Sequence, residues 1–265
     1  MSWTPAAFVS HGAPTVALER DGYTASMAAL GRRLRPAAVA VVSAHWQTHG
    51  AVVVTSSPLP RTIHDFGGFP EALYRIQYPA PGDPALAARI VDLLASAGIP
   101  AGADPDRGLD HGAWVPLRLA WPGADVPVVQ ISLPDAEPEE LWRMGRVLSP
   151  LRERGVLLLG SGGMVHNLEL VDLSRKERPP EPWAAAFDRW VAERLEARDF
   201  AALLAYRRRA PHAYLAAPTS EHFDPIFPVL GAAADEENAV PVFEGFHYGS
   251  LGMRSFELRE GANPQ

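Results

Sequence analysis

Three apolar runs in this chain each lead through small residues to a histidine. The runs Phe8–Val9, Val41–Val42 and Leu157–Leu159 lead to His11, His45 and His166. In a parallel sheet all carboxyl ends of the strands face the same way, so groups that follow several strands converge on one crevice. Imidazole nitrogen is a common ligand of divalent metals, although a lone histidine at a strand end is often a hydrogen-bonded structural residue. The repeated pattern predicts a sheet whose carboxyl edge carries a metal site.

Short β-branched runs alternate with longer stretches of helical periodicity, as an α/β sheet requires. The predicted strands are Ala6–Val9, Ala38–Ser43, Ala51–Thr55, Val126–Ser132 and Gly155–Gly160. The predicted helices are Ser26–Leu34, Pro84–Ala97, Trp114–Leu119, Glu137–Leu148, Glu181–Ala197 and Asp199–Arg207. Two later runs, Val240–Phe246 and Met253–Leu258, alternate apolar and polar residues and predict an antiparallel strand pair. We expect one α/β domain over residues 1–265, with a central, mostly parallel sheet flanked by helices and this C-terminal strand pair.

Composition and charge limit the partners of the chain. Of its 265 residues 47% are hydrophobic and 21% charged, which is ordinary for a globular protein. Its net charge of −7 predicts no attraction to nucleic acid or to an anionic membrane surface. The N-terminus lacks the pattern of a signal peptide, and no apolar run approaches the roughly 20 residues of a membrane span. We expect a cytoplasmic protein that acts on a small molecule.

Cysteine is absent, so a metal would be held by imidazole, carboxylate or carbonyl groups. His111 precedes a predicted helix that Asp110 could cap, and a substrate or proton-handling role fits it. His222 lies between Glu221 and Asp224, which could be carboxylate ligands or hydrogen-bond partners. His247 lies on the late strand pair, where structural and functional roles are both open.

Two segments rich in glycine have a predicted role near the crevice. Residues 58–83 hold several prolines and glycines around His64 and Phe69, and a loop this long in a compact domain tends to be functional. We interpret it as an active-site flap. In Gly160–Gly163 the glycines permit a tight turn with positive φ, and free amides there could bind an anion. A plain turn from strand to helix is the alternative for this second segment.

Six segments, in this order and spacing, carry a resemblance to a known family. They are Ser10–Pro14, Ser43–Trp46, His64–Pro70, Leu109–Trp114, Gly160–Asn167 and Glu221–Phe223. Together they resemble the class III extradiol ring-cleavage dioxygenases, specifically the 4,5-DOPA dioxygenase branch. The resemblance runs from about residue 8 to 256. It implies a non-haem Fe(II) enzyme that opens a catechol ring next to its two hydroxyls with O₂.

The resemblance also implies roles for individual residues. His11, His45 and His222 would be the metal ligands, where more distant class III enzymes use glutamate as the third ligand. His166 would be the catalytic acid and base, and His111 a catalytic group that binds substrate or oxygen. A set of three neutral histidines suits Zn(II) about as well as Fe(II). The expected cofactor is therefore one divalent metal ion, either Fe(II) for activity or Zn(II) as found.

Aromatic side chains near these motifs could stack on a catechol ring. The candidates are Phe66, Phe69, Tyr74, Trp114 and Tyr248. Arg75 or Arg254 could pair with a substrate carboxylate. The residues that we predict to bind substrate are His64, Phe69, Trp114 and His247.

Two other functions fit the same residues. A zinc-dependent hydrolase could use the same ligands, with His166 or Glu221 as the base. A non-enzymatic metal-binding protein could share the fold, since fold alone does not determine chemistry. The presence of His166 and His111 beside the ligands favours an enzyme, with a catechol and O₂ as its partners. A homodimer joined through the C-terminal strand pair is compatible with the pattern.

Overall fold

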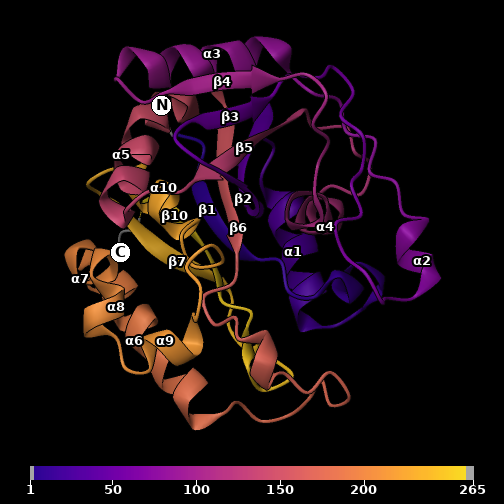
Figure 1. Ribbon diagram of the computed structural model, residues 1–265, viewed down its shortest axis with the longest axis vertical. Helices are drawn as coiled ribbons and strands as arrows, with labels where there is room; N and C mark the ends of the chain where they lie inside the picture. The colour runs from indigo at the N-terminus through magenta and orange to yellow at the C-terminus, as the bar shows by residue number, and fades with distance from the viewer. Residues whose placement is uncertain (1–2, 261–265) are drawn as a thin grey trace.

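A mixed sheet of eight strands organises the computed structural model, which describes residues 3–260 (Figure 1). The strand order is β4-β3-β5-β2-β6-β1-β10-β7. These strands are β1 (Ala6–Ser10), β2 (Ala38–Thr48), β3 (Val52–Thr55), β4 (Ala101–Asp104), β5 (Val128–Pro134), β6 (Val156–Gly162), β7 (Glu237–Phe243) and β10 (Ser255–Glu260). The central strands β5, β2, β6 and β1 are parallel, whereas β3 and β10 run antiparallel to their central neighbours. This confirms the predicted α/β fold.

Helices cover both faces of the sheet. They are α1 (Gly22–Arg33), α2 (Glu71–Tyr74), α3 (Pro84–Ser96), α4 (His111–Ala120), α5 (Pro138–Leu148), α6 (Pro182–Glu196), α7 (Phe200–Leu204), α8 (Tyr206–Arg209), α9 (Ala213–Ala216) and α10 (Ile226–Gly231). Three 3₁₀ helices accompany them: η1 (Pro14–Leu18), η2 (Ser149–Arg154) and η3 (Leu168–Leu170). Within residues 3–260, no helix is both long and apolar enough to cross a membrane.

The core has two layers because successive strand residues point to opposite faces of the sheet. Val9 belongs to the layer under α1 and α4, and its neighbour Phe8 belongs to the layer under α3, α5, α6 and α10. Figure 1 shows α1 and α4 on one side of the sheet and α5 and α10 on the other. Both faces of β1 and β6 are covered, which explains why these strands are apolar without alternation.

The structure differs from the sequence expectation in several places. Strand β2 continues to Thr48, so His45 lies within a strand and not after one. A register shift between Val42 and Gln47 interrupts its pairing with β5, and such an irregularity re-aims side chains. The edge strand β4 was not predicted, because its sequence of alanine and glycine has low β-propensity. The predicted helix Asp199–Arg207 is divided into α7 and α8.

The C-terminal strand pair is an extension of the main sheet. Strand β10 pairs antiparallel with β7 on one side and with β1 on the other. The connection between β7 and β10 contains a small hairpin of β8 (Phe246–His247) and β9 (Leu251–Gly252). Pairing with β1 therefore brings residues from the end of the chain beside the strand that leads to His11.

A buried ion pair attaches strand β7 to η2. The side chain of Arg152 is fully buried, and that of Glu237 is 6% exposed. Arg152 Nη1 donates to Glu237 Oε2 over 2.8 Å, and Arg152 Nε donates to the carbonyl oxygen of Thr4 over 2.8 Å. Glu237 also accepts a hydrogen bond from the backbone of Ala234. The pair thus joins three segments that are distant in sequence.

Replacing Glu237 with alanine should lower the free energy of unfolding by about 3 to 5 kcal/mol, because it leaves a buried guanidinium without a charged partner. Urea denaturation followed by circular dichroism measures this change. The control is Glu71→Ala, which removes an exposed carboxylate paired with Arg75 and should change stability little. An equal loss of unfolding free energy in the two variants would contradict the stabilising role given to the buried ion pair.

Candidate metal centre and catalytic site

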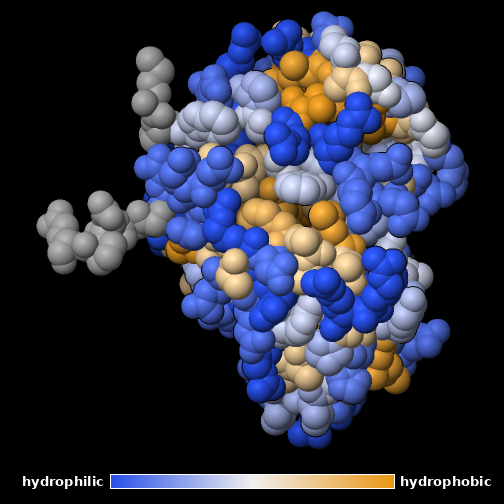
Figure 2. Space-filling view, turned by 90° about the vertical axis from the view of Figure 1, so that its left-hand side faces the viewer, coloured by the Kyte–Doolittle hydropathy of each residue, from blue (hydrophilic) through white to orange (hydrophobic). Residues whose placement is uncertain are grey.

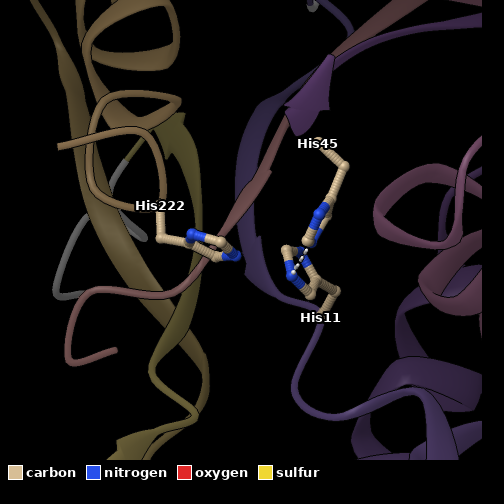
Figure 3. A group of neighbouring side chains, drawn as sticks. All are labelled: His11, His45 and His222. Atoms are coloured by element: carbon tan, nitrogen blue, oxygen red, sulfur yellow. Dashed lines mark hydrogen bonds between the residues drawn. The ribbon is translucent and has the colours of Figure 1, made fainter. Parts of the chain in front are cut away.

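Three histidines from distant parts of the chain meet at the carboxyl edge of the central strands (Figure 3). His11 follows β1 directly, His45 lies in β2, and His222 lies in the turn before α10. One ring nitrogen of each lies within 4.8 Å of the others. The Nε2 atoms of His11 and His45 are 3.0 Å apart, and the ring of His222 has its centroid 4.9 Å from that of His45. The sequence correctly predicted the convergence of His11 and His45.

Hydrogen bonds at the Nδ1 atoms orient the rings of His11 and His222. Ser161 Oγ donates its single hydrogen to the carbonyl oxygen of Gly112, so it accepts a hydrogen bond from His11 Nδ1, which lies 3.1 Å away. Glu221 Oε1 lies 2.9 Å from His222 Nδ1 and accepts from it. Burial raises the pKa of Glu221, but the hydrogen bonds from His222 and Thr219 and the charge of His222 together outweigh it and lower that pKa to about 2. In both histidines Nε2 is therefore left with a free lone pair.

The free nitrogens fit a divalent metal ion. Two imidazole nitrogens 3.0 Å apart, on His11 and His45, repel each other unless a proton or a cation lies between them. His222 Nε2 is buried and has no hydrogen-bond partner within residues 3–260. Burial, and then the neighbouring histidines, lower the pKa of His11 and of His45, which keeps their rings neutral. Histidines that bind a metal typically have a neutral ring whose second nitrogen donates a hydrogen bond to a neighbouring group.

Glycines in β6 allow the His222 segment to approach the sheet. A Cβ on Gly162 would lie 2.1 Å from the carbonyl oxygen of His222. Gly163 N donates to that same oxygen over 2.8 Å, and Gly162 O accepts from His11 N. The expectation of positive φ and free amides is wrong, since neither Gly162 nor Gly163 has positive φ and these backbone groups are paired. Their function is close backbone contact.

His166 lies against the third histidine of the triad. Its ring stacks on that of His222, with centroids 3.5 Å apart and planes 7° apart. Burial, and then the charge of His222, lower the pKa of His166 to about 3. Its backbone N–H donates to the carbonyl oxygen of Ala216. A neutral ring in this position can accept a proton from a group bound beside the triad.

His111 lies on the other side of the site, as the first residue of α4. Its ring centroid is 3.9 Å from that of His45 and 5.4 Å from that of His11. Asp65, which the sequence analysis did not select, has its Oδ2 atom 3.0 Å from His111 Nδ1. Phe66 packs edge-on against the same ring at 5.5 Å. The loop of residues 58–83 therefore reaches the site through Asp65 and Phe66.

The fully buried Asp110 attaches the start of α4 to the sheet. Its Oδ1 atom accepts from Ala113 N over 3.1 Å and from Ser43 Oγ over 2.7 Å. Gln130 Nε2, in β5, donates to its other oxygen. Burial raises the pKa of Asp110, while the hydrogen bonds from Ser43 and Gln130 oppose that effect. The predicted helix cap is confirmed, and the same carboxyl group links α4 to two strands.

The predicted substrate residues occupy two regions. The rings of His64 in the loop and Trp114 in α4 pack edge-to-face, with centroids 5.8 Å apart, and Trp114 is fully buried. Phe69 packs on Phe66 at 5.5 Å. His247 lies in β8, and its Nε2 atom is 3.4 Å from Asp21 Oδ2. Contact of any of these residues with a substrate stays a prediction.

Both arginines considered for a substrate carboxylate have protein partners. Arg254 donates to both carboxylate oxygens of Asp188 and also to Glu244. Arg75, the residue after α2, pairs with Glu71 at the start of that helix, and both side chains are exposed.

Sequence reasoning missed Asp65 and Ser161. Each lies next to a residue that it selected or inside a segment that it quoted, so the signal was proximity to a motif. Ser161 contacts His11, and Asp65 contacts His111, only because the fold brings these distant residues together.

Gly162→Ala should weaken zinc binding by at least tenfold, because its Cβ would displace the backbone that carries His222. Competition with a chromophoric chelator measures the affinity. Gly163→Ala is the matched control, since its Cβ would lie 3.6 Å from the nearest atoms of His166, an ordinary contact. Similar zinc affinity in the two variants would contradict the role given to Gly162.

Comparisons with known proteins agree on one family. Residues 5–253 match the family described as the catalytic LigB subunit of aromatic ring-opening dioxygenase. A protein of Escherichia coli (strain K12) named 4,5-DOPA dioxygenase extradiol is 43% identical over 259 residues, covering 96% of this chain and 94% of that protein. A Beta vulgaris protein of the same name is 37% identical over 262 residues, covering 95% of each chain.

A solved structure gives the same picture of the fold. The crystal structure of an uncharacterized protein from Escherichia coli K12 has a TM-score of 0.81 and 38% sequence identity to this chain. The similarity covers 96% of this chain and 99% of that one.

Proposed function

This chain belongs to the LigB family of aromatic ring-opening dioxygenases, and from that premise we propose that it is an extradiol enzyme that opens a catechol ring beside its two hydroxyls. Both atoms of O₂ enter the product. Relatives named 4,5-DOPA dioxygenase extradiol favour a catechol with a DOPA-like side chain. The observation that carries the proposal is the triad of His11, His45 and His222 with two further histidines beside it. The named relatives do not favour the zinc hydrolase or the non-enzymatic binding protein.

The triad would hold one divalent ion, and Fe(II) is the ion that we propose for activity. When bound, such an ion brings the catechol and O₂ together and supplies the electron exchange that their reaction needs. The donor set is neutral, and zinc fits it as well but cannot change oxidation state. The role of the chain is to keep the rings of His11 and His45 neutral through burial, and to orient those of His11 and His222 through Ser161 and Glu221.

His166 is the proposed acid and base. Its ring is neutral and lies against His222, so it can take a proton from a catechol hydroxyl and return it as the ring opens. His111, close to His45 on the other side, is the proposed hydrogen-bond partner of the substrate or of oxygen. Two titratable rings on opposite sides of the triad allow proton removal and proton return to occur at different atoms.

The loop of residues 58–83 is the proposed wall of the catechol pocket within a single catalytic domain. Its base is attached beside α4, because Ile63 N donates to Leu109 O and Leu109 N donates to Arg61 O. Its tip includes Gly67 and Gly68, where an added Cβ would meet nothing within 4 Å. We propose that the tip moves as a flap while the base stays attached, with His64 and Phe69 forming part of the wall.

His166→Ala should lower turnover of L-DOPA by 10²- to 10⁴-fold while metal content stays at one ion per chain, because His166 serves the proton transfer and is not a ligand. Oxygen consumption and elemental analysis of the same sample measure the two quantities. His222→Ala is the comparison and should lose metal together with activity. Loss of metal in His166→Ala would place that histidine among the ligands.

Anaerobic reconstitution with Fe(II) should give a protein that consumes O₂ with a catechol and forms a yellow ring-opened product. The same protein loaded with Zn(II) should consume none, since zinc does not cycle electrons. An oxygen electrode and visible spectroscopy follow both samples. If the Fe(II) sample takes up no O₂ with any catechol of a panel, the proposed function is wrong.

A further inference from the structure

A carboxylate from the loop of residues 58–83 contacts His111 at two points. Asp65 Oδ1 accepts from His111 N over 2.9 Å, and Asp65 Oδ2 lies 3.0 Å from His111 Nδ1. One carboxylate thus accepts a hydrogen bond from the backbone of His111 and lies in close contact with the ring nitrogen of the same residue, which makes no aligned hydrogen bond within residues 3–260. Its side chain is 22% exposed, and that of His111 is 7% exposed. The contact is therefore largely shielded from solvent.

We propose that Asp65 is a positioning residue, which holds the His111 imidazole with Nδ1 protonated so that Nε2 is left free for the substrate side of the metal centre. An ionised carboxylate has no hydrogen to donate and repels a nitrogen lone pair, so the ring nitrogen that lies 3.0 Å from it is the one that carries the hydrogen. The other nitrogen of a neutral imidazole then has a free lone pair. The proposal rests on the proposed function only in giving His111 a substrate to act on.

The charge of Asp65 supports this orientation. Burial raises the pKa of Asp65, but its contacts with His111 and His45 together outweigh burial and hold the pKa below the usual range. The carboxylate also lies at the N-terminus of α4, where it satisfies the first N–H of the helix and interacts favourably with the helix dipole. An anion at this position is therefore stabilised by the fold.

A direct metal-ligand role for Asp65 does not fit the geometry as well. His45 Nε2 faces His11 over 3.0 Å, whereas His45 Nδ1 faces Asp65 Oδ2 over 3.8 Å. Asp65 therefore lies behind the His45 ring, on the side away from the facing nitrogens of the triad. At 3.8 Å it attracts His45 through charge but makes no hydrogen bond to it. Its hydrogen-bonding partner is His111.

The loop and α4 hold Asp65 in place together. Trp114 Nε1 in α4 donates to Ile63 O, two residues before Asp65, over 2.9 Å. Phe66, one residue after it, packs edge-on against His111 with the planes 88° apart. The chain on both sides of Asp65 is thus attached to the helix that begins with His111. We infer that the loop supplies the orientation of a catalytic ring in addition to a pocket wall.

The test compares Asp65→Asn and Asp65→Ala with the control Glu71→Gln, an exposed carboxylate in the same loop. In Asp65→Asn the side-chain oxygen can still accept from the backbone N–H of His111. The amide NH₂ of the asparagine then faces His111 Nδ1, so the ring hydrogen of His111 should move to Nε2. Long-range ¹H–¹⁵N correlation spectra of the zinc-loaded proteins report this tautomer without any turnover. An unchanged His111 tautomer in Asp65→Asn would overturn the proposal.

Kinetics of the Fe(II) enzyme give the second measurement. Either Asp65 variant should lower kcat for L-DOPA by about 10- to 100-fold, with KM and metal content close to those of the unmodified protein. In a His111→Ala background the Asp65 substitution should cause no further loss, because both act through one ring. Losses that multiply, or metal loss in Asp65→Asn, would contradict the positioning role. If the unmodified enzyme opens no catechol, the proposed function fails, while the tautomer of the zinc protein still decides the role of Asp65.

Discussion

The facing nitrogens of His11 and His45, 3.0 Å apart, create the electrostatic problem that the surrounding structure solves. Two buried lone pairs in such proximity are stable only around a shared cation or proton. The protein directs a third free nitrogen, from His222, to the same place and engages the outer nitrogens with Ser161 and Glu221. Burial lowers the pKa of the central rings, so the site keeps lone pairs available for a metal.

The sheet positions these groups through contacts that allow little movement. Gly162 lets the backbone of His222 lie directly against β6, where any side chain would collide with it. Asp110 joins the start of α4 to β2 and β5, and Ser161 joins β6 to the same helix through Gly112. His11, His45 and His111 are therefore held by one connected set of strands and one helix, and the turn that carries His222 lies directly against β6. A site built on strands and a helix is positioned more accurately than one built on loops alone.

The space around the triad has two chemically different sides. On one side His166 stacks on His222, close to Glu221. On the other side His111 lies beside His45, with Asp65 and Phe66 of the loop around it. Each side thus pairs a ligand histidine with a second histidine and a carboxylate. This arrangement separates two proton-handling groups across the site, which suits a reaction that removes a proton early and returns one late.

Local sequence determined the parallel strands, the convergence of His11 and His45 and the helix cap at Asp110, because short apolar runs, strand ends and capping depend on neighbours in the chain. His222 follows no strand, and only family resemblance suggested it as a ligand. Tertiary structure alone decided that Asp65 faces His111 and that Gly162 serves close contact in place of a turn. Both contacts join residues more than forty positions apart in the sequence. Hydrophobic periodicity reports only on neighbouring residues, so it cannot predict such long-range contacts.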